Sequence, residues 1–275
     1  ADPNIQCVDG DSPLHYAVGF MDDDEKSREV VELMIAKNAD INLKNVNDRT
    51  VLHDAFEKRN IATAGLLIKR GADPNIQCVD GDSPLHYAVW FIDDDEKSRE
   101  MVELMISKNA DIDLKNVDGR TALHIAFVKR NIATAGLLIK RGADPNIQCV
   151  DGYSPLHCAV WFLDDDEKSR AIVQLLIAKN ADVNLKGVNA STALHIAAFK
   201  GKVETAKLLV SSGAKPNTLN IEDLTPLHQS AHCSNSQRRL CMVDFLLSQK
   251  ADPWATDYYA SRMRCTFLIC KICRN

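Results

Sequence analysis

The stretch ADPNIQCVDG occupies residues 1–10 and occurs again, unchanged, at residues 72–81 and 143–152. The 71 residues that begin with its first copy match the following 71 at 61 positions. Such agreement indicates that a block of this length was duplicated in tandem. Periodicity of this kind is typical of repeat architectures, so it decides the fold class before any single residue is considered.

Each block divides again into two shorter units. Residues 9–15 (DGDSPLH) are echoed 38 residues later by residues 47–53 (NDRTVLH), and the next echo, from Asp80, follows after a further 33. More echoes begin at residues 118, 151, 189 and 222. The sequence therefore predicts a repeat array over residues 1–254, with six full units and a divergent seventh. Residues 255–275 are interpreted as a divergent tail or incomplete repeat.

The unit at residues 118–150 shows why this pattern implies paired helices. Thr121 has the chemistry of a helix N-cap, and a short helix is expected directly after it. A second helix is expected over residues 132–140, closed by Gly142 in the left-handed conformation. Residues 143–152 are rich in turn formers and predict a hairpin. Because one unit cannot bury its apolar face alone, we expect an all-α repeat solenoid of stacked helix pairs with projecting β-hairpin loops.

The 33-residue unit resembles the ankyrin repeat, which carries T-P-L-H-x-A and ends in G-A-D-x-N. The motif reads SPLHYA at residues 83–88, TALHIA at 121–126 and 192–197, and TPLH at 225–228. The resemblance implies antiparallel helix pairs and a protein partner that meets the hairpin tips and the exposed ends of the inner helices. It also implies a structural, unit-to-unit bonding role for the histidines of the motif, which are His15, His53, His86, His124, His157, His195 and His228.

The positions that the resemblance assigns to partner binding carry aromatic and charged side chains. The Trp–Phe pairs at residues 90–91 and 161–162 are the strongest candidates for contact with a partner, because large aromatic side chains dominate binding hot spots. The alternative is that the neighbouring insertion folds back over these rings and makes them core. The first block has Gly19 in place of Trp90, so this position tolerates loss of the side chain. The candidate set is Asp82, Trp90, Phe91, Arg120, Lys129, Tyr153, Trp161, Phe162 and Lys200.

Acidic insertions of five residues separate the two helices of the first, third and fifth units, at residues 21–25, 92–96 and 163–167. We interpret them as groups that stabilise the positive end of the second helix. Binding of a basic partner and binding of calcium are the alternatives, although the DDDE run lacks the spaced ligands and the turn glycine of a calcium loop.

Nothing in the sequence points to catalysis, a cofactor or a metal. There is no glycine-rich phosphate loop, no G-x-S-x-G and no H-E-x-x-H, and the Cys270–Cys273 pair has no second pair at zinc-finger distance. The net charge of -5 argues against nucleic acid as the main partner. No apolar run is long enough for membrane insertion. An odd count of nine cysteines without a signal segment suggests reduced thiols and an intracellular location, cytoplasmic or nuclear.

The predicted function is binding of one or more protein partners by a monomeric array, as a non-catalytic scaffold, adaptor or inhibitor. One alternative is a targeting segment of a larger protein, such as a ligase, kinase, channel or acyltransferase. We expect a longer native chain because residue 1 is Ala rather than Met. The other alternative is a structural spacer without a specific partner.

Overall fold

The computed structural model describes residues 2–93 and 96–255. The chain forms two compact bodies, which we call the N-terminal body (residues 1–143) and the C-terminal body (residues 144–275). In the described ranges all regular structure is helical and no residue lies in a β-strand. The predicted all-α class is confirmed. The array boundary at residue 254 stays a prediction, and the predicted tail from residue 256 on, with its three cysteines, lies outside the described residues.

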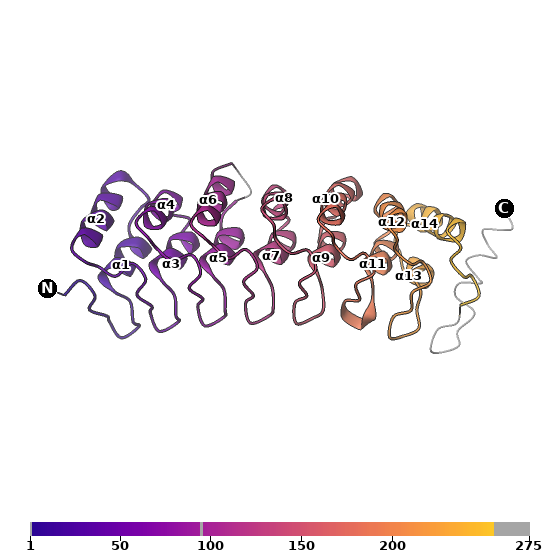
Figure 1. The fold of residues 1–275 in the computed structure, drawn as a ribbon, viewed down its shortest axis with the longest axis horizontal. Helices are drawn as coiled ribbons and strands as arrows, with labels where there is room; N and C mark the ends of the chain where they lie inside the picture. The colour runs from indigo at the N-terminus through magenta and orange to yellow at the C-terminus, as the bar shows by residue number, and fades with distance from the viewer. Residues whose placement is uncertain (1, 94–95, 256–275) are drawn as a thin grey trace. The chain divides into compact units, whose positions relative to one another are not determined.

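Four helix pairs build the N-terminal body. They are α1 (Pro13–Phe20) with α2 (Glu25–Ala36), α3 (Val51–Glu57) with α4 (Ile61–Lys69), α5 (Pro84–Phe91) with α6 (Glu96–Ser107), and α7 (Ala122–Val128) with α8 (Ile132–Lys140). Figure 1 shows the first helix of each pair in a row next to the hairpin loops and the second helices in a row beyond it. We call these the inner and the outer helices.

Three helix pairs build the C-terminal body in the same way. They are α9 (Pro155–Phe162) with α10 (Asp166–Ala178), α11 (Ala193–Lys200) with α12 (Val203–Ser211), and α13 (Pro226–Ser230) with α14 (Ser236–Ser248), and a short 3-10 helix, η1 (Val188–Ala190), precedes α11. The odd-numbered helices are again the inner ones. None of the described helices in either body is both long and apolar enough to cross a lipid bilayer.

Local signals in the sequence set the helix ends as expected. Thr121 is the N-cap of α7, and α8 begins and ends at the predicted residues. Gly142 follows α8 with a φ of +102°, the left-handed conformation that favours glycine. Pro84 and Pro155 each occupy the first position of an inner helix, where no backbone N–H bond is lost.

The motif histidines bond one repeat to the next. In α3 the backbone N–H of Thr50 donates to Nδ1 of His53 (3.1 Å), and Nε2 of His53 donates to the carbonyl oxygen of Asp82 in the following repeat (3.2 Å). Nε2 donates in the same way to a carbonyl oxygen of the following repeat, over 3.0–3.3 Å, in His15, His86, His157 and His195. The structural role predicted for these five imidazoles is confirmed.

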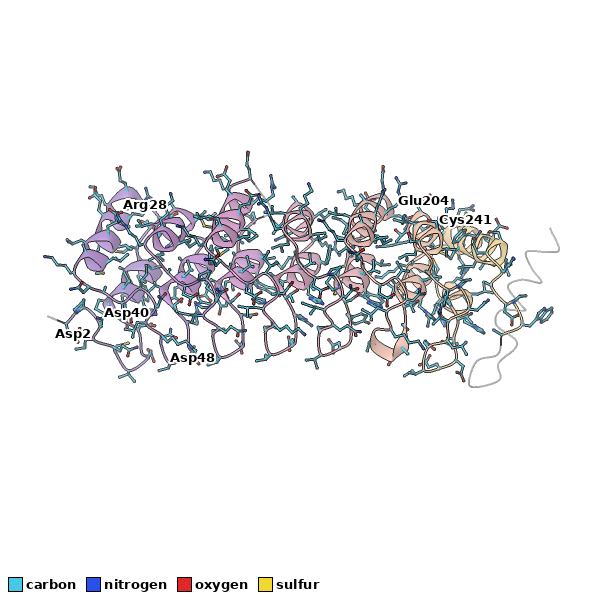
Figure 2. The ribbon with its side chains drawn as sticks, viewed as in Figure 1. Asp2, Arg28, Asp40, Asp48, Glu204 and Cys241 are labelled. Carbon is cyan, nitrogen blue, oxygen red and sulfur yellow. The ribbon has the colours of Figure 1, made fainter. Side chains whose placement is uncertain are left out.

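The stack is held by buried aromatic side chains and by a ladder of hairpins. Phe56 and Phe127 are fully buried, as expected of residues that fill the space between repeats. Neighbouring hairpins are joined through the backbone, as where Val46 N–H donates to the Asp9 carbonyl (3.2 Å). Gly10 permits this approach, because a Cβ there would lie 2.6 Å from the Val46 nitrogen. Figure 2 labels Asp48 on one of these loops.

The acidic insertions cap helices in their own repeat and in the next one. Asp24 accepts a hydrogen bond from Ser27 N–H at the start of α2 (2.7 Å), which confirms the helix-terminal interpretation for the first repeat. Asp23 reaches further and accepts the N–H groups of Ala62 and Thr63 at the start of α4 (2.9 Å each). Asp165 and Asp166 divide the same two tasks in the fifth repeat. Residues 94–95 of the third repeat's insertion lie outside the described residues.

Candidate functional site

A tryptophan with a lysine over its ring occurs once in each body. Trp90, in the last turn of α5, is 41% exposed, and Nζ of Lys129 lies 4.8 Å from its ring centre. Trp161, in the last turn of α9, is half-buried, and Nζ of Lys200 lies 4.5 Å from its ring centre. The structure thus brings four of the predicted site residues together as two cation–π pairs.

Repeat geometry places each lysine. Lys129 is the C-cap of α7 and Lys200 is the last residue of α11, so each ammonium comes from the inner helix that follows the tryptophan. Each lysine stands 39 residues after its tryptophan. A contact of this kind contributes about 0.5–1 kcal/mol at an exposed site, which is enough to bias the indole toward one orientation.

The neighbouring phenylalanines extend these aromatic surfaces. Phe199 stacks on Trp161 with ring centres 5.9 Å apart and is 37% exposed, although the predicted set did not contain it. Its place at the end of an inner helix, just before Lys200, was the signal for it. Phe91 packs against Tyr87 (5.4 Å), and both Phe91 and Phe162 are half-buried. The insertions therefore leave part of each ring accessible.

Other predicted site residues take part in packing between repeats. The Asp82 carboxylate accepts a hydrogen bond from the Asn116 side chain (2.9 Å), which ties two hairpins together. The ring of Tyr153 lies edge-on to His157 (6.0 Å), and burial raises the pKa of its hydroxyl. Arg120 lies beside its hairpin, with its guanidinium 3.7 Å from the carboxylate of Asp118.

The sequence did not predict an ion cluster that joins Arg49, just before α3, to side chains of α3 and α5. The guanidinium of Arg49 donates to Asp54 (2.6 Å) and to Glu57 (2.5 Å), and it lies over the ring of Tyr87 at 5.4 Å. Burial disfavours the charge of Arg49, but the bond to Glu57 and the charge of Asp54 outweigh that cost and raise its pKa. The positive charge of Arg49 is therefore fully paired within the protein.

Metal-binding potential is confined to one group in the described part of the chain. Asp11, His15 and Asp54 offer ligand atoms within 4.8 Å of one another. Each already has a protein partner, since Asn45 donates to Asp11 (2.8 Å), Arg49 binds Asp54, and Nδ1 of His15 accepts the N–H of Ser12. We read the group as packing between repeats.

A buried ammonium occupies the turn between α11 and α12. Lys202 is 2% exposed and donates to the carbonyl oxygens of Val160 (2.7 Å) and Leu163 and to the Ser169 hydroxyl (2.9 Å). Desolvation lowers its pKa to about 8. The second repeat has Asn60 at this position, and its amide donates to the equivalent carbonyl (2.9 Å). Lys202 is thus a helix-capping group rather than part of the exposed surface.

Comparisons with known proteins agree with this architecture. A family model described as ankyrin repeats (3 copies) matches residues 1–78, 24–113, 85–187 and 165–257. Among solved structures, the ankyrin repeat domain of Bcl-3, from the IkappaB protein family, superposes with a TM-score of 0.66 at 30% identity, covering 87% of this chain and 99% of that one. An ankyrin repeat domain from Acinetobacter baumannii AYE gives 0.65 at 28% identity, covering 74% and 98%.

Two curated sequences match over shorter stretches. The ankyrin repeat protein FPV244 of fowlpox virus is 42% identical over 60 residues, which are 22% of this chain and 9% of that protein. The ankyrin repeat protein BB_B28 of Borreliella burgdorferi is 36% identical over 64 residues, which are 23% of this chain and 16% of that protein. The chain therefore spans under a fifth of either relative. Since the family model matches along nearly the whole sequence, the chain belongs to the ankyrin repeat family, whose members typically serve as protein-interaction modules without catalytic activity.

Proposed function

We propose that this chain acts as a non-catalytic adaptor or inhibitor that holds a protein partner against the exposed ends of its inner helices. The observation that carries the proposal is Trp90, which stays 41% exposed at the end of α5 with Lys129 over its ring. A large aromatic side chain that remains accessible in a folded protein is a common anchor of an interface. The Trp161–Lys200 pair gives the C-terminal body an equivalent anchor.

The scaffold favours such a role because its surface is preformed. The His53 imidazole and the hairpin backbone bonds fix each repeat against its neighbour within a body. A partner that meets an ordered surface loses less conformational entropy on binding than one that must order a flexible surface. The ankyrin repeat domain of Bcl-3, a member of the IkappaB protein family, supports this form of function by its similar fold.

A second candidate is a targeting segment of a larger protein. It is favoured by the curated relatives, of which this chain spans 9% and 16%. In that case the surface would recruit a partner to an activity located elsewhere in the polypeptide. A spacer without a partner would not need an exposed tryptophan, and we disfavour it for that reason.

We place this function in a reducing compartment inside the cell. The six cysteines in the described part of the chain are all free thiols, and four of them are buried: Cys78, Cys149, Cys158 and Cys233. Fluorescence of a tagged protein in living cells, together with thiol labelling of the purified protein, tests this placement. A secreted, disulfide-linked form would contradict it.

The binding test compares affinity capture by three forms of the chain from the same lysate. The double variant Trp90→Ala with Trp161→Ala should capture at least about tenfold less of each partner protein, because such anchors contribute about 2 kcal/mol or more to the binding free energy. Leu240→Ala is the matched control, since Leu240 is also 41% exposed but lies on an outer helix, α14. Far-UV circular dichroism should be unchanged in all three. An unchanged set of captured proteins, or loss of helix in the double variant, would contradict the proposal.

A further inference from the structure

We propose that the hairpin tips of the N-terminal body bind a proline-rich segment of a partner protein, which carries an aliphatic side chain at every third residue and a basic one at every sixth. This site goes beyond the proposed function, because it lies on the hairpin loops and not on the inner helices. It is formed by one exposed aliphatic side chain at the tip of each hairpin, and we call these four residues the tip row: Val8, Val46, Val79 and Val117.

The tip row is apolar at a position where turns ordinarily carry a polar residue. Each of its valines occupies the second position of a four-residue turn, closed as where Gly10 N–H donates to the Cys7 carbonyl (2.9 Å). Turns favour Gly, Pro, Asn, Asp and Ser. The four valines are nevertheless between 54% and 97% exposed, and the other three repeats have Val150, Val188 and Ile221 at this position. Local structure does not require these side chains, and an exposed, contiguous apolar surface is typical of an interaction site.

Backbone hydrogen bonds hold neighbouring tips side by side. Each of the last three valines donates its N–H to the carbonyl oxygen of the residue that follows the previous valine, over 3.0–3.2 Å, as Val46 does to Asp9. Figure 1 shows the hairpin loops of this body in a row beyond the inner helices. Because the four valines occupy equivalent positions in bonded hairpins, they form one continuous row and not four scattered side chains.

The spacing of the tip row selects a segment in the polyproline II conformation. The inner helices pack directly on one another, α1 on α3, α3 on α5 and α5 on α7. Helices in contact lie about 8–10 Å apart, so the tips recur at about the same spacing. A polyproline II helix has three residues per turn and rises about 3.1 Å per residue, so its side chains return to the same face after about 9.3 Å. A β-strand has a period of two residues and would turn every second one of these side chains away.

The charges at the tips select basic residues in the partner. At the second and fourth tips the acid pairs with a cation of its own hairpin, as Asp48 does with Lys44 (3.5 Å). The first and third tips carry Asp9 and Asp80, which are exposed and form no ion pair in the part of the chain that the structure describes. These two tips are two repeats apart, which corresponds to six residues of the polyproline II segment. A basic side chain at that interval meets both carboxylates, so charge complementarity favours it.

The test measures fluorescence anisotropy of two labelled peptides with the full chain. The matched peptide has valine at every third position, lysine once in every six residues and proline elsewhere, and the scrambled peptide has the same composition without this period. The matched peptide should bind at least about tenfold more tightly, because only its register buries the valines against the tips. The triple variant Val46→Ser, Val79→Ser and Val117→Ser should weaken its binding at least about tenfold, because the apolar contacts are lost while the turns keep a residue that they favour.

An exposed aliphatic residue away from the tips provides the control. Leu33→Gln alters the outer helix α2 and should leave the affinity for the matched peptide unchanged. Far-UV circular dichroism should be unchanged in both variants, and Val79→Ser alone decides if the triple variant loses helix. Equal binding of the two peptides, an unchanged affinity in the serine variant, or no binding of the matched peptide at millimolar concentration would overturn the inference. The lysate capture tests Trp90 and Trp161 and not the tip row, so the proposed function stands or fails separately.

Discussion

Lowering the pH from 7.5 to 5.0 should destabilise the repeats, because their buried imidazoles stay neutral in the folded state whereas the imidazoles of the unfolded chain take up protons. Burial lowers the pKa of His53, His157 and His195 from 6.5 to about 4. In each repeat Nδ1 of the motif histidine accepts a hydrogen bond from a backbone N–H, as from Thr192 to His195 (3.1 Å). Protonation of Nδ1 would place two N–H groups against each other and break that hydrogen bond. The folded state therefore holds fewer protons than the unfolded chain between pH 4 and pH 6.5, and stability falls as the pH drops through that window.

The size of the loss follows from the two pKa values. Between pH 7.5 and pH 5.0, an imidazole with a pKa of about 4 when folded and 6.5 when unfolded costs about 2 kcal/mol. His53 lies in the N-terminal body, whereas His157 and His195 both lie in the C-terminal body. The C-terminal body should thus lose about 4 kcal/mol, against about 2 kcal/mol from His53 in the N-terminal body. Losses of that size are a large part of the total stability of an ordinary domain.

Urea unfolding followed by far-UV circular dichroism at the two pH values measures this loss. His195→Gln removes one titrating group, so the variant should be less stable at pH 7.5 but lose about 2 kcal/mol less on acidification than the wild type. His232→Gln is the control, because His232 is exposed. If the wild type and His195→Gln respond to pH within about 0.5 kcal/mol of each other, the buried neutral imidazole is not the cause.

Two further predictions concern contacts between repeats. Raising the pH from 7 to 10 should stabilise the wild type relative to Lys202→Asn by about 2–3 kcal/mol. The pKa of Lys202 is lowered to about 8, so its buried charge is lost as the pH rises. If urea unfolding shows the same pH response for both proteins, Lys202 is not a buried ammonium. Asp23→Ala should lower the free energy of unfolding by about 1–2 kcal/mol in thermal unfolding, because the start of α4 loses its hydrogen-bond acceptor. Asp22→Ala, at an exposed neighbour, should lower it by less than about 0.5 kcal/mol. Equal losses of stability in the two variants would refute the capping role of Asp23.

Most of the fold could be predicted because short segments of each repeat determine where its helices begin and end. A hydroxyl residue, then three residues later a histidine, sets the start of every inner helix, as Thr121 and His124 do for α7. Helix propensity and the turn glycine set the outer helix, which is why α8 has the predicted bounds. These signals act over three to ten residues, within reach of sequence reasoning.

The contacts that sequence reasoning missed join residues from different repeats. Asp23 caps a helix that begins about 40 residues later, and Lys202 reaches carbonyls about 40 residues earlier. Residue identity does not reveal these contacts. The DDDE run predicts a cap only for the helix that directly follows it, and a lysine is ordinarily exposed. The register does carry a signal, since both Trp–Lys pairs repeat at the same separation of 39 residues. Aligning the repeats by their hairpins would have placed each lysine beside its tryptophan.

A comparison of the duplicated blocks, residues 1–71 and 72–142, distinguishes positions that hold the repeat together from positions that vary between the copies. The first two blocks differ at ten positions, and neither the N-cap residues of the inner helices nor the motif histidines are among them. Four of the ten lie on the inner helices. The fully buried Val51 gives way to Ala122. Gly19, Asp54 and Glu57 give way to Trp90, Ile125 and Val128. The last three changes add an indole and remove two carboxylates, while the helices keep equivalent bounds in the two blocks. Because the helices accept both sets of side chains, exchanging them between the blocks should have little effect on folding. A change in the captured proteins would then come from the exchanged side chains themselves and not from a change of fold.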